Sequence, residues 1–226
     1  MDDHVVITLL RHGLTLENER SAYIGWTDSS LSEQGRTILQ KVKKQWESCH
    51  PLDGNTFTFL CKTLIQPEHV FSSDLQRCLE TATILFPTYP IQTSAELREM
   101  NFGAWEGKTY SELKDIPTYR EWLDHPLTKR PDRGESFQQF SERIESGFSK
   151  IKQQIIASAS RSAVIVTHGG VIRYLLTTYT SSAKHFFDWD VPHGGGYQLI
   201  WSMESLRRGE TCMSLQEVPS MAKRNG

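Results

Sequence analysis

Five residues of the sequence have the side chains that phosphoryl transfer requires, and each lies at or soon after the end of a short apolar run: Arg11, His12, Arg77, Glu99 and His168. Two guanidinium groups form an anion site, because their forked donors match the geometry of phosphate oxygens. A neutral imidazole is a nucleophile toward phosphorus. A carboxylic acid can protonate a leaving alkoxide and then, as a carboxylate, activate water. Together the five side chains supply every role that a phosphoryl transfer needs.

These side chains can act together only if the runs before them are strands that end at one edge of a sheet. Four segments are typical of short strands: 5–10 (VVITLL), 69–73 (HVFSS), 91–97 (IQTSAEL) and 162–168 (SAVIVTH). Helical patterns occupy 32–47, 75–86, 136–157 and 169–179, and GGGYQLIWSM adds a further strand. Ligands of parallel sheets bind outside the carboxyl ends of the strands, so we expect the site there.

The alternation of strands and helices predicts an α/β fold, specifically a single-domain three-layer α/β/α sandwich with a mainly parallel central sheet. We expect one domain over residues 1–216, with 101–135 as a capping excursion of short helices. Residues 217–226 are predicted to be a flexible tail.

Composition narrows the class of protein. The chain has 226 residues and a formal net charge of −2, so no basic excess attracts it to nucleic acid or to an anionic membrane. No apolar stretch approaches the length of a membrane span, and the start of the sequence lacks the pattern of a signal peptide. The four cysteines, Cys49, Cys61, Cys78 and Cys212, form no CxxC pair and read as reduced thiols. We therefore expect a cytoplasmic protein.

Four blocks of the sequence, LLRHGLT, SSDLQRCLETA, LREMNFGAWEG and VTHGGVIR, resemble in order the signature blocks of the histidine phosphatase superfamily. This superfamily includes cofactor-dependent phosphoglycerate mutases and many small-molecule phosphatases. Two supporting blocks, GWTDSSLSEQG and RGESFQQFSERI, are also similar, and the resemblance runs from about residue 5 to 200. It implies a phosphoglycerate mutase-like fold.

The resemblance also implies roles for individual residues. His12 would be the nucleophile that becomes phosphorylated, and Glu99 the proton donor. The phosphoryl group would be held by Arg11, Arg77 and His168. Further phosphate contacts would come from Asn18 and from a backbone amide of Gly169 or Gly170. The implied partner is a small-molecule phosphate ester, and no cofactor or metal is implied.

The block LREMNFGAWEG resembles the phosphatase side of the superfamily, and the chain is most similar to alpha-ribazole phosphatases, which remove a 5′-phosphate. Alpha-ribazole 5′-phosphate is therefore a candidate substrate. Two alternatives remain open: a cofactor-dependent phosphoglycerate mutase and a non-catalytic phosphate-binding relative. The sequence does not indicate an oligomeric state.

Glu96 and Glu106 compete with Glu99 for the role of the acid. Two histidines and a carboxylate could instead ligate a metal, but two arginines aimed at the same place argue against a cation there.

Two further features lie outside the five-residue set. Aromatic side chains of the capping segment, Trp105, Tyr110 and Trp122, could line a substrate pocket, although packing is the commoner role of such residues. The motif HGGG at 193–196 predicts a tight turn near the mouth of the pocket.

Overall fold

The computed structural model describes residues 4–48 and 63–218. Its strands are β1 (His4–Arg11), β2 (His69–Ser73), β3 (Ile91–Ser94), β4 (Ser162–Thr167), β5 (Gly196–Ser202) and β6 (Ser214–Val218). The helices that cover the sheet are α2 (Glu33–Ser48), α4 (Gln76–Leu85), α7 (Phe137–Ala157), α8 (Gly169–Tyr179) and α9 (Met203–Arg208). Short helices outside these layers are α1 (Leu16–Glu19), α5 (Tyr110–Leu113), α6 (Pro117–Asp124) and the 3₁₀ turns η1 (Ala95–Leu97), η2 (Gly103–Trp105) and η3 (Phe186–Asp188).

The six strands form one sheet in the order β3-β2-β4-β1-β5-β6. Parallel pairing joins β3, β2, β4 and β1, whereas β5 runs antiparallel to both β1 and β6. The prediction of a mainly parallel sheet is confirmed. Because β1, β4 and β2 are adjacent, their carboxyl ends meet at one edge.

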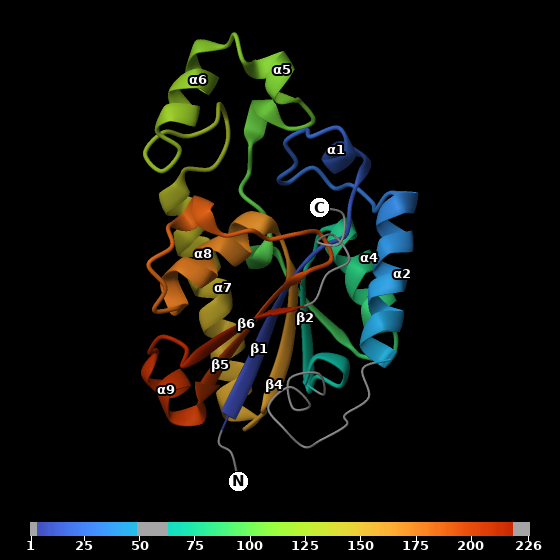
Figure 1. Cartoon of the computed structure of the whole chain (residues 1–226). Coiled ribbons are helices and arrows are strands. Elements are labelled where there is room, and N and C mark those ends of the chain that lie inside the picture. Colours follow the sequence, from blue (N-terminus) through green and yellow to red (C-terminus); the bar gives the residue numbers. More distant parts are fainter. Residues whose placement is uncertain (1–3, 49–62, 219–226) are drawn as a thin grey trace.

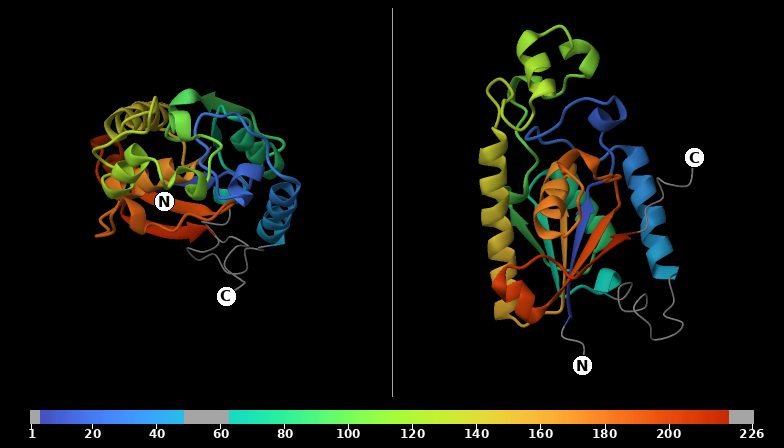
Figure 2. Two further views of the ribbon diagram at one scale, coloured as in Figure 1. Left: turned by 90° about the horizontal axis from the view of Figure 1, so that it is seen from above. Right: turned by 60° about the vertical axis from the view of Figure 1, so that its left-hand side comes forward.

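Helices cover both faces of the sheet, which confirms the predicted three-layer sandwich. Successive strand residues point to opposite faces, so Ile7 and Leu9 pack with the cluster that includes α7, α8 and α9, whereas Leu10 packs with α2 and α4. The right-hand view of Figure 2 shows α7 and α2 on opposite sides of the sheet. The strand β4 is buried along its whole length, as its continuous apolar pattern predicts.

The segment predicted to cap the sheet, 101–135, lies beyond the carboxyl ends of the parallel strands. Figure 1 shows its helices α5 and α6 at the top of the molecule, above α8 and the α1 loop. They are held together by a small apolar cluster of Trp105, Leu113, Tyr119 and Trp122. This cluster is separate from the two that flank the sheet, so the cap has a core of its own.

Two predicted boundaries differ from the structure. The segment 91–97 is a strand only to Ser94, because η1 then turns the chain toward Glu99, with Ser94 as its N-cap. Glu217 and Val218, predicted as the start of a tail, instead complete β6 by pairing with Tyr197 and Gly196. The rest of that segment, 219–226, lies outside the described residues, as do Cys49 and Cys61. Within the described part, Cys78 and Cys212 are buried free thiols.

In the part of the chain that the structure describes, no helix is both long and apolar enough to cross a membrane.

Candidate active site

The five residues proposed for phosphoryl transfer lie around one edge of the sheet. Arg11 ends β1 and His12 follows it, while His168 follows β4 and caps helix α8. Arg77 lies in the first turn of α4, after β2, and Glu99 lies beyond η1. The sequence predicted this convergence from strand exits alone, and the strand order β2-β4-β1 provides it.

His12 is a buried imidazole with a defined tautomer. Its side chain is only 3% exposed, and its Nδ1 lies 2.7 Å from the carbonyl oxygen of Gly13. A carbonyl can only accept, so Nδ1 carries the proton and Nε2 keeps its lone pair. Burial, reinforced by the positive charge of Arg77, holds the pKa of His12 well below its ordinary value. The ring is therefore neutral at physiological pH, which is the form a nucleophile needs.

Arg77 is fully buried, and the loop 25–27 fixes its guanidinium group. One terminal nitrogen donates to the carbonyl of Thr27 at 2.9 Å and the other to the carbonyl of Gly25 at 2.6 Å. The buried Nε has no partner in the structure. Burial lowers the pKa of Arg77, but it stays a cation near neutrality. A buried cation with an unused N–H is suited to an anionic ligand.

Arg11 is the last residue of β1 and directly precedes His12. Its guanidinium donates to the carbonyl of Val191 at 2.6 Å, and its buried Nε is also without a partner. Burial lowers the pKa of Arg11 to about 10. Both arginines thus hold one N–H in reserve, which gives the site two buried donors for an anion.

His168 contacts His12 edge to face, with ring centroids 5.1 Å apart. Its Nε2 lies 2.9 Å from the hydroxyl of Ser73 at the end of β2, and the ring has no solvent exposure. Burial, then the nearby Arg77, keeps the pKa of His168 well below its ordinary value. The neutral ring completes the wall of the site between β2 and β4.

Glu99 approaches this site from the loop after η1. Its Oε2 accepts a hydrogen bond from the backbone N–H of Gly170 at 2.9 Å, and its Oε1 accepts one from Met100 at 3.0 Å. The carboxylate is thereby tied to the first turn of α8, immediately after His168. Glu96, one of the two competitors, instead binds Lys150 and Ser146 on α7.

Glu106, the other competitor, supports the loop that holds Arg77. Its carboxylate accepts hydrogen bonds from the backbone N–H groups of Trp26 at 2.7 Å and Thr27 at 2.5 Å, and from the Thr27 hydroxyl. It also accepts one from Phe102 at 3.2 Å. Each oxygen of Glu106 accepts two hydrogen bonds, whereas each oxygen of Glu99 accepts one.

The three residues predicted to contact phosphate, Asn18, Gly169 and Gly170, have different partners in the structure. The amide of Gly170 is used by Glu99, so we keep the predicted phosphate contact for Gly169, where a Cβ would lie 3.3 Å from the Arg11 guanidinium carbon. The Oδ1 of Asn18 caps α1 by accepting from the Thr15 backbone N–H and hydroxyl, each at 3.2 Å. Its side chain also lines a polar pocket of about 280 Å³ together with Arg11.

His193 also belongs to the site, and sequence reasoning assigned it no role. Its Nδ1 donates to the carbonyl of His12 at 3.1 Å, and the two rings contact edge to face at 5.2 Å. Burial lowers the pKa of His193 to about 3. The sequence feature that could have indicated this residue is the HGGG motif, which forms the predicted turn. In that turn Gly194 has φ +71°, and its N–H donates to the carbonyl of Arg11 at 3.1 Å. The turn therefore anchors the backbone that presents Arg11 and His12.

A larger cavity of about 410 Å³ adjoins Glu99 and Gly170. Seven of its lining side chains are aromatic: Tyr23, Phe102, Trp122, Phe137, Phe140, Phe186 and Phe187. Among the residues that the structure describes, Arg173 of α8 is the one cation that lines it. Of the cap aromatics considered above, Trp122 lines this cavity, Tyr110 lines the polar pocket and Trp105 is buried in the core of the cap. Tyr23 lines both hollows, and the polar pocket also includes Arg11 while the larger cavity includes Glu99.

No group of three or more His, Cys, Asp or Glu side chains in residues 4–48 and 63–218 is arranged to hold a metal ion. Arg11 and Arg77 bring guanidinium donors with unpartnered Nε groups to the site, and such donors suit an anion.

A protein-family model described as the histidine phosphatase superfamily (branch 1) matches residues 7–206. Phosphoglycerate mutase-like protein 4 of Arabidopsis thaliana is 28% identical over 188 residues, which cover 80% of this chain and 74% of that protein. The adenosylcobalamin/alpha-ribazole phosphatase of Salmonella typhimurium is 30% identical over 193 residues, covering 79% of this chain and 83% of the relative. The crystal structure of the alpha-ribazole phosphatase from Shigella flexneri superposes with a TM-score of 0.69 at 24% identity, over 86% of this chain and 90% of that chain.

Proposed function

The chain belongs to the histidine phosphatase superfamily, and on that premise we propose that it hydrolyses a small-molecule phosphomonoester through a phosphohistidine formed on His12. One observation carries the proposal. The Nδ1–H of His12 donates to the Gly13 carbonyl at 2.7 Å, so the lone pair of Nε2 is available beside two arginines whose buried Nε groups have no partner.

In the first step, Nε2 of His12 attacks phosphorus and the bond from phosphorus to the ester oxygen breaks. Protonated Glu99 gives its proton to that oxygen, so the product leaves as an alcohol and Glu99 becomes a carboxylate. The equatorial oxygens carry the charge of the transition state, and Arg11 and Arg77 face them with their unpartnered N–H groups.

In the second step, water attacks phosphorus and the nitrogen–phosphorus bond breaks, with its electron pair returning to Nε2. Glu99 takes a proton from the water and is ready to act as an acid again. The proton on Nδ1 stays in its hydrogen bond to Gly13 throughout, so His12 begins and ends the cycle as the same neutral tautomer.

The aromatic cavity beside Glu99 supports a substrate whose leaving group carries an aromatic ring. We propose alpha-ribazole 5′-phosphate as the candidate, because it is a nucleoside phosphate with an aromatic base and because a relative bears the name alpha-ribazole phosphatase. Arg173 would then face a polar edge of the base or sugar.

Two parts of the proposal, the phosphatase activity and the identity of the substrate, are tested by measuring phosphate release. The substrates to compare are alpha-ribazole 5′-phosphate, sugar phosphates, nucleotides and phosphoglycerates. Quenching with alkaline denaturant during turnover of a ³²P-labelled ester should trap label on the wild-type protein, because the nitrogen–phosphorus bond of phosphohistidine is stable to base and labile to acid. The His12→Ala variant should trap none. Near-normal turnover by that variant would refute the mechanism. Stimulation by 2,3-bisphosphoglycerate, with mutase turnover exceeding phosphate release, would favour a mutase instead.

A further inference from the structure

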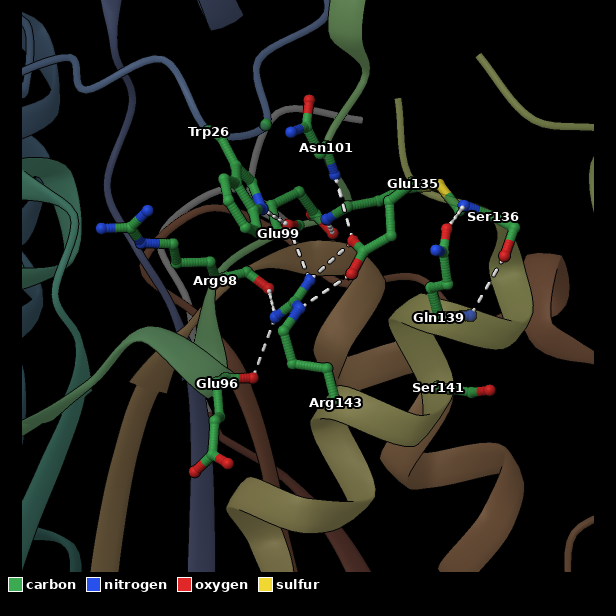
Figure 3. A network of polar contacts seen from close by, with 12 residues as sticks. Trp26, Glu96, Arg98, Glu99, Asn101, Glu135, Ser136, Gln139, Ser141 and Arg143 are labelled. Carbon is green, nitrogen blue, oxygen red and sulfur yellow. Dashed lines mark hydrogen bonds and ion pairs between the residues drawn. The ribbon is translucent and has the colours of Figure 1, made fainter. Parts of the chain in front are cut away.

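The block RGESFQQFSERI supplies none of the catalytic candidates, yet two of its side chains surround the backbone of the proposed acid. Arg143 projects from α7 toward the loop that carries Glu99, and Glu135 precedes the N-cap of the same helix (Figure 3). Their side chains are only 15% and 10% exposed. Because the Arg143–Glu135 ion pair is largely buried, its two side chains hold one geometry and can fix the position of the backbone that they contact.

Arg143 uses its guanidinium to hold three carbonyls of one short segment. One terminal nitrogen donates to the carbonyls of Glu96 and Arg98, each at 2.9 Å, and the other donates to the carbonyl of Glu99 at 3.2 Å. The carbonyl of Leu97 between them accepts from the hydroxyl of Thr167 at 2.8 Å. Every carbonyl from 96 to 99 is thus bound by a side chain, as a segment without a strand partner requires.

Glu135 orients the guanidinium and secures the far end of the same segment. Its two oxygens accept from Nε and a terminal nitrogen of Arg143, at 2.9 and 2.8 Å, in a two-bond fork. One of them also accepts from the backbone N–H of Asn101 at 3.3 Å, while the N–H of Glu135 donates to the Asn101 carbonyl at 2.9 Å. Glu99 therefore lies between two anchored residues.

Trp26 joins this network to the phosphate side of the site. Its indole N–H donates to the carbonyl of Glu99 at 3.0 Å, and the Arg143 guanidinium lies 5.7 Å from its ring centroid. Trp26 belongs to the loop whose neighbouring carbonyls, Gly25 and Thr27, hold Arg77. The carbonyl of Glu99 is thus bound both by the clamp from α7 and by the loop that carries the anion site.

We propose that Arg143 and Glu135 are positioning residues that set the location of the Glu99 carboxyl relative to the leaving group. The inference rests on the proposed function, in which Glu99 is the acid. A planar guanidinium with five donors can bind three carbonyls and a carboxylate at once, which lysine cannot do. Replacing it should therefore impair proton donation selectively, because in the described part of the chain neither side chain of this pair is hydrogen-bonded to Arg11, Arg77 or His12.

The test compares two aromatic substrates that differ in their need for an acid. The leaving group of 2,4-dinitrophenyl phosphate departs without a proton, whereas that of benzyl phosphate requires one. Because kcat/KM reports the step in which the ester bond breaks, Arg143→Lys should lower it at least about 10-fold for benzyl phosphate and less than about 3-fold for 2,4-dinitrophenyl phosphate. Glu135→Gln, which keeps the shape of the side chain, should show the same selectivity to a smaller degree and covers the case in which Arg143→Lys does not fold.

Two reference variants make the outcomes distinct. Arg36→Lys breaks a similar two-bond pair with Glu80, between α2 and α4, and should leave the ratio of the two kcat/KM values at the wild-type level. Glu99→Gln should give the full selective loss, and equal loss on both substrates there would refute the acid role in the proposed function. Selective loss in Glu99→Gln but an unchanged ratio in both clamp variants would overturn the positioning inference alone.

Discussion

The carboxylate of Glu99 is bound to the backbone N–H of Gly170 at 2.9 Å, which ties the proposed acid to the first turn of α8. The preceding residue in that turn lies against Arg11, and His168 caps the helix. The start of α8 thus contacts the proposed acid and one arginine and carries one histidine, so it fixes the relative positions of these three residues.

Gly170→Ala should disable the acid. A Cβ at this position would overlap Oε1 of Glu99, so the carboxylate must leave the Gly170 N–H. We expect kcat/KM for benzyl phosphate to fall about 100-fold, the lower end of a general acid's contribution, with the far-UV circular dichroism spectrum unchanged. Activity within about 3-fold of the wild type would contradict the assignment of Glu99.

The free energy of unfolding should decrease as the pH falls below about 6.5, the ordinary pKa of histidine. His12, His168 and His193 stay neutral in the folded protein because burial lowers the pKa of each, but they gain protons in the unfolded chain. Between about pH 7.5 and 5.5, each should cost about 1.4 kcal/mol of stability.

Urea denaturation in a phosphate-free buffer measures this pH dependence, with His193→Gln as the comparison. The variant lacks one of the three titrating rings, so its loss of stability over the same pH range should be smaller by about 1.4 kcal/mol. Parallel curves for the two proteins would show that His193 is not a buried neutral ring.

Chelation should leave the phosphatase activity intact. In the proposed mechanism, Arg11 and Arg77 supply the positive charge that phosphoryl transfer needs, and their buried Nε groups have no partner in the structure. Dialysis against EDTA should therefore change kcat/KM by less than about 2-fold, well short of the loss expected when a catalytic metal is removed. Loss of activity that added Mg²⁺ or Zn²⁺ restores would assign a catalytic role to a metal.

The sequence predicted the convergence of the candidate site residues better than the lining of the aromatic cavity, for a physical reason. Strand exits are fixed by hydrophobic pattern, so the convergence of His12 and His168 follows once their strands are neighbours. The role of His193 depends on a turn returning to the carbonyl of His12, a long-range contact that no local pattern encodes. In the same way, only the packing of the cap places Trp122 at the cavity while it buries Trp105.

Phe187→Ala should weaken binding of substrates with an aromatic leaving group. The ring lines the large cavity but is 59% exposed, so its removal should cost little stability. Loss of one aromatic contact of about 1 kcal/mol should raise KM for benzyl phosphate about 5-fold and leave that for glycerol phosphate unchanged. Leu127→Ala, at an exposed residue of the cap that does not line this cavity, is the matched control. Equal changes in KM for both substrates would show that the cavity does not select for an aromatic leaving group.

Glu106→Gln should lower activity without regard to the leaving group. The Glu106 carboxylate binds the backbone of Trp26 and Thr27, and the carbonyls of Gly25 and Thr27 hold Arg77, so the variant loosens the anion site. An amide can keep only part of these bonds, because its nitrogen donates rather than accepts.

We expect kcat/KM for benzyl and 2,4-dinitrophenyl phosphate to fall together, about 10-fold, and inhibition by inorganic phosphate to weaken by a similar factor, since one charge-assisted hydrogen bond contributes about 1.5 to 3 kcal/mol. Glu99→Gln should instead spare 2,4-dinitrophenyl phosphate and leave inhibition by phosphate near the wild-type value. The two carboxylates are thereby separated by what each supports: Glu106 holds the loop that positions a cation, and Glu99 transfers the proton. If Glu106→Gln lost activity only toward benzyl phosphate, the role of the acid would belong to Glu106 and not to Glu99.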